Sequence, residues 1–216
     1  MPLEPTLDEI QKLLMLIKFL GIQGLSLAIG PLVGAEGSIP KALQKQSQVE
    51  RLRKELDEQI SRYLATQFPD AAEVRVLMLI SRLSSRIDAM GREVVRIGEI
   101  AYGPVSSGEV AGQILELFET GCQILNHSVT AFFELGTAAA GQSLQRAKGH
   151  DDKLAGMLER SRHAGEGAAL IAAVSRVALE AQSVSHEIAA FVTAYTPEKV
   201  RVPGANMASH IRVSRS

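Results

Sequence analysis

The sequence predicts an all-α protein with two tandem three-helix bundles, six long helices in total, related by internal duplication. Three observations support this fold class. Two segments place apolar residues at alternating steps of four and three, which is the spacing of one helix face. Gly and Pro cluster between the helical stretches. No segment of useful length shows the apolar-polar alternation of a strand.

The first predicted helix covers about 7–29. Its apolar residues recur every three or four positions, and it ends at Gly30-Pro31 because proline cannot continue a helix. The run 13–33 holds one charge, Lys18, and is long enough to cross a bilayer. Polar residues interrupt the run and no basic cluster flanks it, which favours a buried bundle helix over a membrane span.

The second helix is predicted over about 40–67, with a charged outer face in the stretch ERLRKELDEQ. Pro69 is expected at the first position of the third helix, where a missing N–H costs little, and Asp70 and Glu73 suit its positive end. The third helix has the clearest apolar seam, formed by Val76, Ile80, Leu83, Ile87, Met90, Val94, Ile97 and Ala101. We expect Leu83, Ile87, Met90 and Val94 to be almost fully buried.

The stretch YGPVSSGE, residues 102–109, stops the third helix and divides the chain into two halves. We predict a first three-helix repeat over 1–104, a second over 105–197 and a flexible C-terminal tail over 198–216.

Three helices are predicted in the second half, over about 108–135, 138–163 and 167–195. The fourth carries two apolar stripes and the fifth turns Leu144, Ala147, Leu154 and Leu158 inward. The sixth has an uninterrupted seam of Leu170, Val174, Val177, Ala181, Val184, Ile188, Phe191 and Tyr195. The segments VERLRKEL, 49–56, and DDKLAGML, 151–158, share part of their spacing, as expected for a duplication.

Composition limits the function classes. The formal net charge is −1, so there is no overall attraction to nucleic acid. The single cysteine, Cys122, rules out an internal disulfide framework and fits a reducing compartment. The N-terminal residues lack the positive region of a secretory signal, and we expect a cytoplasmic protein.

Asp88 and Arg92 lie one helical turn apart in the third helix. Such a pair is either a surface ion pair or what remains of a site where two acids faced a metal. We favour the exposed ion pair, worth about 0.3–0.5 kcal/mol. Arg75, Arg82, Arg86, Arg92 and Arg96 are interpreted as a solvated outer face, with an anionic partner as the alternative.

The sequence resembles the phosphate-uptake regulator (PhoU) family over residues 7–196. Residues 55–91 follow without gaps that family's passage from its second helix into its third. Glu73 and Arg75, which follow Pro69, match an acid and arginine of the family, and residues 187–195 resemble the end of its second repeat. The resemblance implies two three-helix repeats and a role in phosphate uptake.

The family's signature is a pair of acids four residues apart on the third helix of each repeat. By the resemblance, Asp88 takes the first acid position and Arg92 the second, and Gly91 also matches. In the second repeat the two positions fall on Leu179 and Ser183, or on Glu180 and Val184. Neither repeat keeps an acid pair, so we expect the helical scaffold without the metal chemistry.

No catalytic, cofactor-binding or metal-binding residue is assigned. His127, His150, His163 and His186 lack zinc-site spacing, and the segment His150 to Asp152 is interpreted as solvated helix. The glycines of 21–30 lie within a helix, so they are not a dinucleotide fingerprint.

These observations predict a non-enzymatic regulatory or adaptor protein without a cofactor. By the resemblance, its partner is a membrane phosphate transporter or a sensor kinase, met at the inner face of the membrane, and the protein is a homo-oligomer, a homodimer. The alternatives are a carboxylate metal-binding bundle or metal-dependent enzyme, and a purely structural helical protein.

Overall fold

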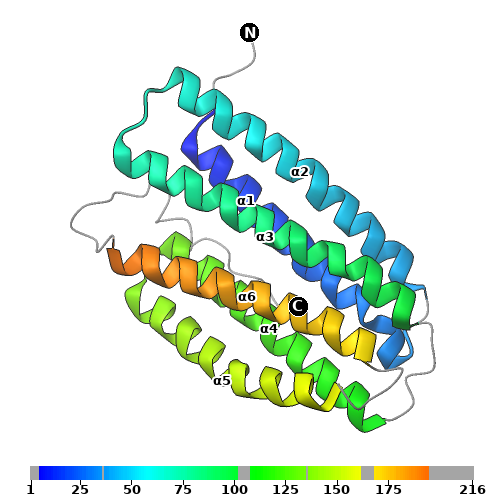
Figure 1. The fold of residues 1–216 in the computed structure, drawn as a ribbon. Coiled ribbons are helices and arrows are strands. Elements are labelled where there is room, and N and C mark those ends of the chain that lie inside the picture. Colours follow the sequence, from blue (N-terminus) through cyan, green and yellow to red (C-terminus); the bar gives the residue numbers. More distant parts are fainter. Residues whose placement is uncertain (1–4, 36, 102–107, 135, 162–167, 195–216) are drawn as a thin grey trace, which may run out of the picture.

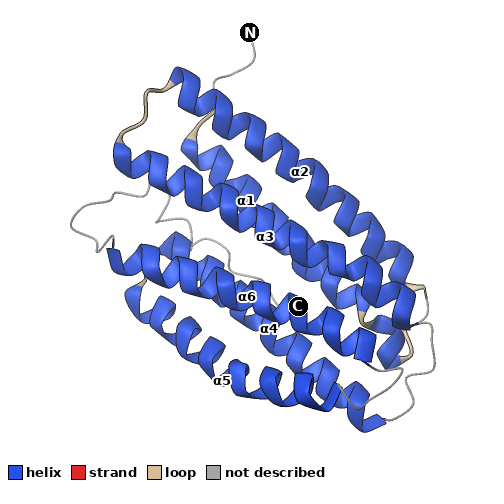
Figure 2. Cartoon of the chain, in the orientation of Figure 1, coloured by secondary structure: helices blue, strands red, loops and turns tan. Residues whose placement is uncertain are grey.

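The structure is a computed structural model, and it describes residues 5–35, 37–101, 108–134, 136–161 and 168–194. The described part is helical and contains no strand, as Figure 2 shows, so the all-α prediction is confirmed. Its elements in chain order are α1 (Leu7–Ala28), a short 3-10 helix (Gly30–Val33), α2 (Ser38–Thr66), α3 (Ala71–Ala101), α4 (Gly108–Glu134), α5 (Thr137–Ser161) and α6 (Ala168–Ala194).

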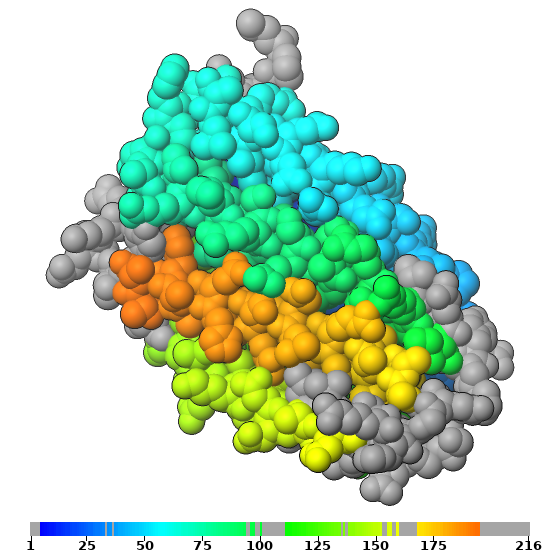
Figure 3. Space-filling model, viewed as in Figure 1, coloured from blue at the N-terminus to red at the C-terminus, as the bar shows by residue number. Residues whose placement is uncertain are grey.

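The helices form two packed groups. Helices α1, α2 and α3 contact one another, as do α4, α5 and α6, and the groups meet chiefly through α3 and α6 (Figure 1). The space-filling view shows the same order, with α6 lying between α3 and α5 at the surface (Figure 3). The predicted boundary near 104 and the predicted tail, 198–216, lie outside the described residues.

Side-chain caps fix two of the helix starts. Thr6 accepts a hydrogen bond from the backbone N–H of Glu9, and the Glu9 carboxylate accepts one from the N–H of Thr6. Asp70 accepts bonds from the backbone N–H groups of Ala72 and Glu73, both at 2.8 Å. The prediction that Pro69 opens the third helix was therefore wrong: Asp70 caps it, and the helix begins at Ala71.

The two apolar seams lie in the core. Leu83, Ile87 and Met90 are fully buried, as predicted, whereas the side chain of Val94 is outside the described set. In α6 the seam is buried from Leu170 to Phe191. In α5 Ala147 is buried and Leu144 is half-buried, while the side chains of Leu154 and Leu158 are not described.

Helices α3 and α6 share one burial pattern. Adding 94 to a residue number in α3 aligns the segment 76–93 with the segment 170–187 of α6, since 170 − 76 = 94. Every buried position of the first segment then falls on a buried position of the second. The shift aligns every step of the two seams as well. The two helices therefore occupy equivalent places in their three-helix groups, as a duplication requires.

Two segments, Leu7–Leu32 and Ala168–Ala194, are long and apolar enough to cross a membrane by length and composition. Their most apolar windows are 56% and 61% buried inside the protein. Such burial is typical of core helices in a bundle, where the apolar surface faces other helices.

Candidate functional site

The carboxylate of Asp88 is the centre of a buried polar cluster between α2 and α3. Only 2% of Asp88 is exposed. Its oxygens accept hydrogen bonds from Gln46 Nε2 at 2.9 Å, from Arg53 at 3.1 Å and from Arg92 at 2.6 Å. The predicted ion pair with Arg92 is present, but the prediction that it is an exposed pair was wrong, because helix α2 covers Asp88 and adds two further donors.

The cluster contains more positive than negative charge. Two guanidinium groups meet a single carboxylate, and both arginines remain partly open to water, with side chains 35% and 59% exposed for Arg53 and Arg92. The carboxylate is thus desolvated but well supplied with donors, as buried charges require. Gln46 holds Oδ1 and the two arginines share Oδ2, so a cation at Asp88 would compete with the amide at one oxygen and with the guanidinium groups at the other.

The second repeat has a different polar pair at the equivalent place. The shift of 94 carries Asp88 to Gln182 and Arg92 to His186. Gln182 is buried and its amide lies 3.3 Å from Nδ1 of His150, whose Nε2 lies 2.9 Å from the carbonyl oxygen of Leu117. Each repeat therefore joins its second and third helices through a buried polar pair.

Two expectations about the second repeat are corrected by this arrangement. The predicted acid positions, Leu179 with Ser183 or Glu180 with Val184, are two or three residues out of register with the burial pattern. His150 was interpreted as solvated together with the two aspartates that follow it. It is only 1% exposed, whereas both aspartates are exposed.

Arg86 joins the two repeats. Its guanidinium donates to Glu180 and to Glu187 of α6, both at 2.8 Å, and about a third of the side chain is exposed. A second ion pair joins the same two helices with the charges exchanged: Arg176 of α6 lies 3.8 Å from Glu93 of α3. The interpretation of the α3 arginines as a solvated face was therefore wrong for Arg86.

A further polar contact between repeats is formed by Lys18 of α1. Its Nζ donates to Oδ1 of Asn126 of α4 at 3.0 Å, and only 7% of the residue is exposed. Burial lowers the pKa of Lys18 below its ordinary value of 10.5, because the charged form loses water. The sequence identified Lys18 as a charge inside an apolar run but gave no signal for Asn126.

No metal centre is formed among the described residues: nowhere in them do three or more His, Cys, Asp or Glu side chains gather to hold an ion. Cys122 is half-buried, and its burial, with a smaller contribution from Glu119, raises the pKa of the thiol to about 12. The thiol is therefore not activated as a nucleophile at neutral pH.

Comparison with known proteins identifies the architecture. No protein-family model and no curated protein matches the sequence. The fold is similar to PhoU from Pseudomonas aeruginosa, with 16% identity and a TM-score of 0.68 over 87% of this chain and 97% of that one. It is similarly close to the phosphate transport system regulatory protein PhoU from Streptococcus pneumoniae, with 15% identity, a TM-score of 0.69, and 87% and 96% coverage.

The chain has a PhoU-like fold. The predicted resemblance is confirmed at the level of architecture, and the low identity leaves residues and roles to be argued from this structure alone.

Proposed function

We propose that this protein is a non-enzymatic regulator of phosphate transport that acts by binding other proteins. One observation carries the proposal: the PhoU-like fold extends over 87% of this chain and over nearly all of both PhoU chains. The similarity therefore concerns the greater part of both chains rather than a shared fragment.

The surface supports an adaptor role. Several large apolar side chains are exposed to solvent. Phe68, between α2 and α3, is 89% exposed, and Met78 of α3 and Phe19 of α1 are 56% and 55% exposed. Exposed aromatic side chains are the kind of group that anchors protein interfaces. Phe68 also has a positive φ of 47°, which is uncommon for a bulky residue and fixes its position in the turn between α2 and α3.

The partner we propose is a membrane phosphate transporter or its sensor kinase, contacted from the cytoplasm at the inner face of the membrane by a homodimer. A location in the cytoplasm agrees with the burial of the two most apolar helices, since more than half of each apolar window packs inside the bundle. The adaptor then changes its partner's activity through contact alone.

The test is a deletion strain in which phosphate uptake is measured at high and low external phosphate. We expect deletion to alter uptake at high phosphate, and the wild-type gene to restore it. Unchanged uptake under both conditions would contradict a role in phosphate transport.

The contact itself is tested by photocrosslinking from position 68. An unnatural photoreactive residue at Phe68 should capture the transporter or the kinase, identified by mass spectrometry. The same residue placed at Leu179, an exposed apolar position on α6, serves as the matched control. Capture of neither protein from position 68 would count against this surface as the docking site.

A further inference from the structure

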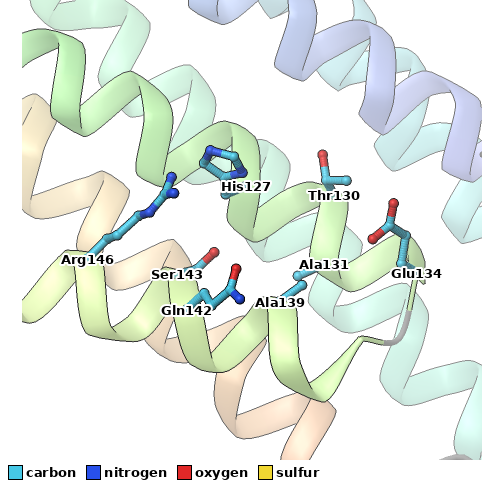
Figure 4. Close-up of a pocket in the computed structure, with 8 residues that line it drawn as sticks. All are labelled: His127, Thr130, Ala131, Glu134, Ala139, Gln142, Ser143 and Arg146. Carbon is cyan, nitrogen blue, oxygen red and sulfur yellow. The ribbon is translucent and has the colours of Figure 1, made fainter.

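A small polar cavity opens between α4 and α5, near the turn that joins them. Its volume is about 90 Å³, room for one small polyatomic ion. Figure 4 shows its lining side chains. The polar ones are His127, Thr130 and Glu134 of α4 and Gln142, Ser143 and Arg146 of α5.

Two nitrogen-bearing side chains of the cavity have no acidic partner. Figure 4 shows the guanidinium of Arg146 and the ring of His127 directed toward the same space from opposite helices. Neither forms an ion pair or hydrogen bond with any other residue that the structure describes. Arginine N–H groups are always charged, and a histidine ring donates at least one N–H in either protonation state.

Ser143 supplies an independent observation. Its hydroxyl is buried, with 2% of the residue exposed, and Oγ has no hydrogen-bond partner in the described part of the protein. Leaving a buried hydroxyl without a partner is unfavourable, so an unpaired hydroxyl that faces a cavity indicates a place for a ligand. Other buried serines also lack partners, but Ser143 is the one that lines this cavity.

The acid in the lining lies at the far end. Glu134 is seven residues beyond His127 on the same helix, which is about 10 Å along the axis. In Figure 4 Glu134 and Arg146 stand at opposite ends of the group of lining residues. A separation of about 10 Å equals one Debye length at about 0.1 M salt, which weakens the repulsion between Glu134 and an anion beside His127. Thr130 adds no donor, because its hydroxyl already donates to the carbonyl of Asn126.

We infer that this cavity binds a single tetrahedral oxyanion of the size of phosphate. Arg146 supplies charge and up to two N–H donors, the Ser143 hydroxyl and one N–H of His127 donate to separate oxygens, and the Gln142 amide closes the remaining side. An oxyanion with four acceptor oxygens satisfies donors that come from two helices at different angles. The inference is independent of the proposed regulatory function.

The oxyanion can be free inorganic phosphate or the phosphate group of a small monoester. Titration calorimetry at about 0.1 M ionic strength with inorganic phosphate, and separately with glycerol 3-phosphate, distinguishes the two sources. Tighter binding of inorganic phosphate assigns the site to the free ion, and tighter binding of glycerol 3-phosphate assigns it to a monoester. Both results support an oxyanion site, and chloride at the same concentration controls for general screening.

Three variants locate the binding in the cavity. Arg146→Gln should weaken phosphate binding about tenfold or more, and Ser143→Ala about three- to tenfold, because each removes a donor to a charged group. Ser143→Ala removes an unpaired hydroxyl, so its fold should be at least as stable as that of the wild type. Arg51→Gln, an exposed arginine on α2, is the matched control and should leave binding unchanged.

Two outcomes overturn the inference. One is the absence of saturable heat with either ligand up to ~10 mM, where a site with millimolar affinity would be visible. The other is binding that Arg146→Gln and Ser143→Ala leave intact, which places the anion elsewhere. Thermal unfolding with and without phosphate gives a second readout, since a ligand that binds only the folded state raises the midpoint temperature.

Discussion

The side chain of Gln46 occupies the space that a side chain on Gly91 would need. A Cβ built on Gly91 would lie 1.6 Å from Oε1 of Gln46, far inside any tolerable contact. Gln46 is 5% exposed, and from this position its amide donates to Asp88 on the same helix as Gly91. Because glycine has no side chain, Gln46 of α2 can reach the buried carboxylate.

We predict that Gly91→Ala destabilises the protein by about 1–3 kcal/mol. Alanine gains up to ~1 kcal/mol from helix propensity. Moving Gln46 aside relieves part of the clash but breaks its bond to Asp88, so the strain and the lost bond together cost about 2–4 kcal/mol. Urea denaturation measures the change.

The control is Gly141→Ala on α5, where an added Cβ meets nothing within 4 Å. That change should stabilise the protein by up to ~1 kcal/mol, because it alters only the helix propensity at position 141. A Gly91→Ala protein as stable as Gly141→Ala would mean that Gln46 leaves its place without cost.

The second prediction concerns metal at Asp88. Protein purified without chelator should carry no stoichiometric iron or zinc bound through Asp88, because Gln46, Arg53 and Arg92 occupy its oxygens. Restoring an acid at position 92 is not enough, since Arg53 would remain 3.1 Å from the carboxylate.

The informative variant is therefore Arg53→Gln combined with Arg92→Asp, which leaves two acids one turn apart and removes both guanidinium groups that contact Asp88. Elemental analysis compares it with the wild type and with Arg92→Asp alone. About one transition-metal ion per wild-type chain, lost in Asp88→Ala, would contradict the prediction.

The sequence predicts the helices and their buried faces but not the contacts that cross between helices. The α3 seam through Leu83 and Ile87 follows from periodicity, which each helix carries in its own residues. The partners of Asp88 could not be predicted in this way, because Gln46 and Arg53 lie 42 and 35 residues away. Periodicity places a residue on a face, and only packing decides what that face meets.

The same limit explains the error at Arg86. On its own helix it lies beside the seam, where an exposed arginine is expected, and its two glutamates are 94 and 101 residues distant. The burial register of α3 and α6 was nevertheless present in the sequence, in two seams with the same steps. Aligning those seams, rather than a motif, would have paired Asp88 with Gln182.

The third prediction is that Arg86→Ala weakens the packing of the two repeats by about 1–2 kcal/mol. The ion pairs with two glutamates are lost, and the expected loss of stability is kept small because Arg86 and Glu180 are about one third exposed. Glu187→Gln combined with Arg86→Ala gives a double-mutant cycle for the pair.

The matched control for Arg86 is Arg82→Ala. Arg82 is exposed and, among the described residues, contacts only the carbonyl of Met78 on its own helix, so its loss should change stability by less than about 0.5 kcal/mol. Equal effects of the two substitutions would show that the ion pairs between repeats contribute nothing of their own.

The fourth prediction is that Lys18→Met stabilises the protein at neutral pH. Lys18 is buried between α1 and α4, its one partner among the described residues is the neutral Asn126, and burial lowers its pKa. Methionine fills a similar volume without a charge, and removing a charge held in an apolar place is worth about 1 kcal/mol. Lys41→Met, at an exposed position on α2, controls for the general effect of removing a lysine.

The pH dependence gives the sharper test. Below the lowered pKa of Lys18 the amine is charged in the folded and unfolded states alike, so the cost of burying the charge is fully present. Between that pKa and the ordinary value of 10.5 the unfolded chain binds more protons than the folded one, so the stability of the wild type rises with pH. The gain from Lys18→Met should therefore shrink as pH rises from 7 toward 10.5 in urea denaturation series, while Lys41→Met shows no such trend. A Lys18→Met protein that is less stable than the wild type at every pH would mean that the bond to Asn126 outweighs the desolvation of the amine.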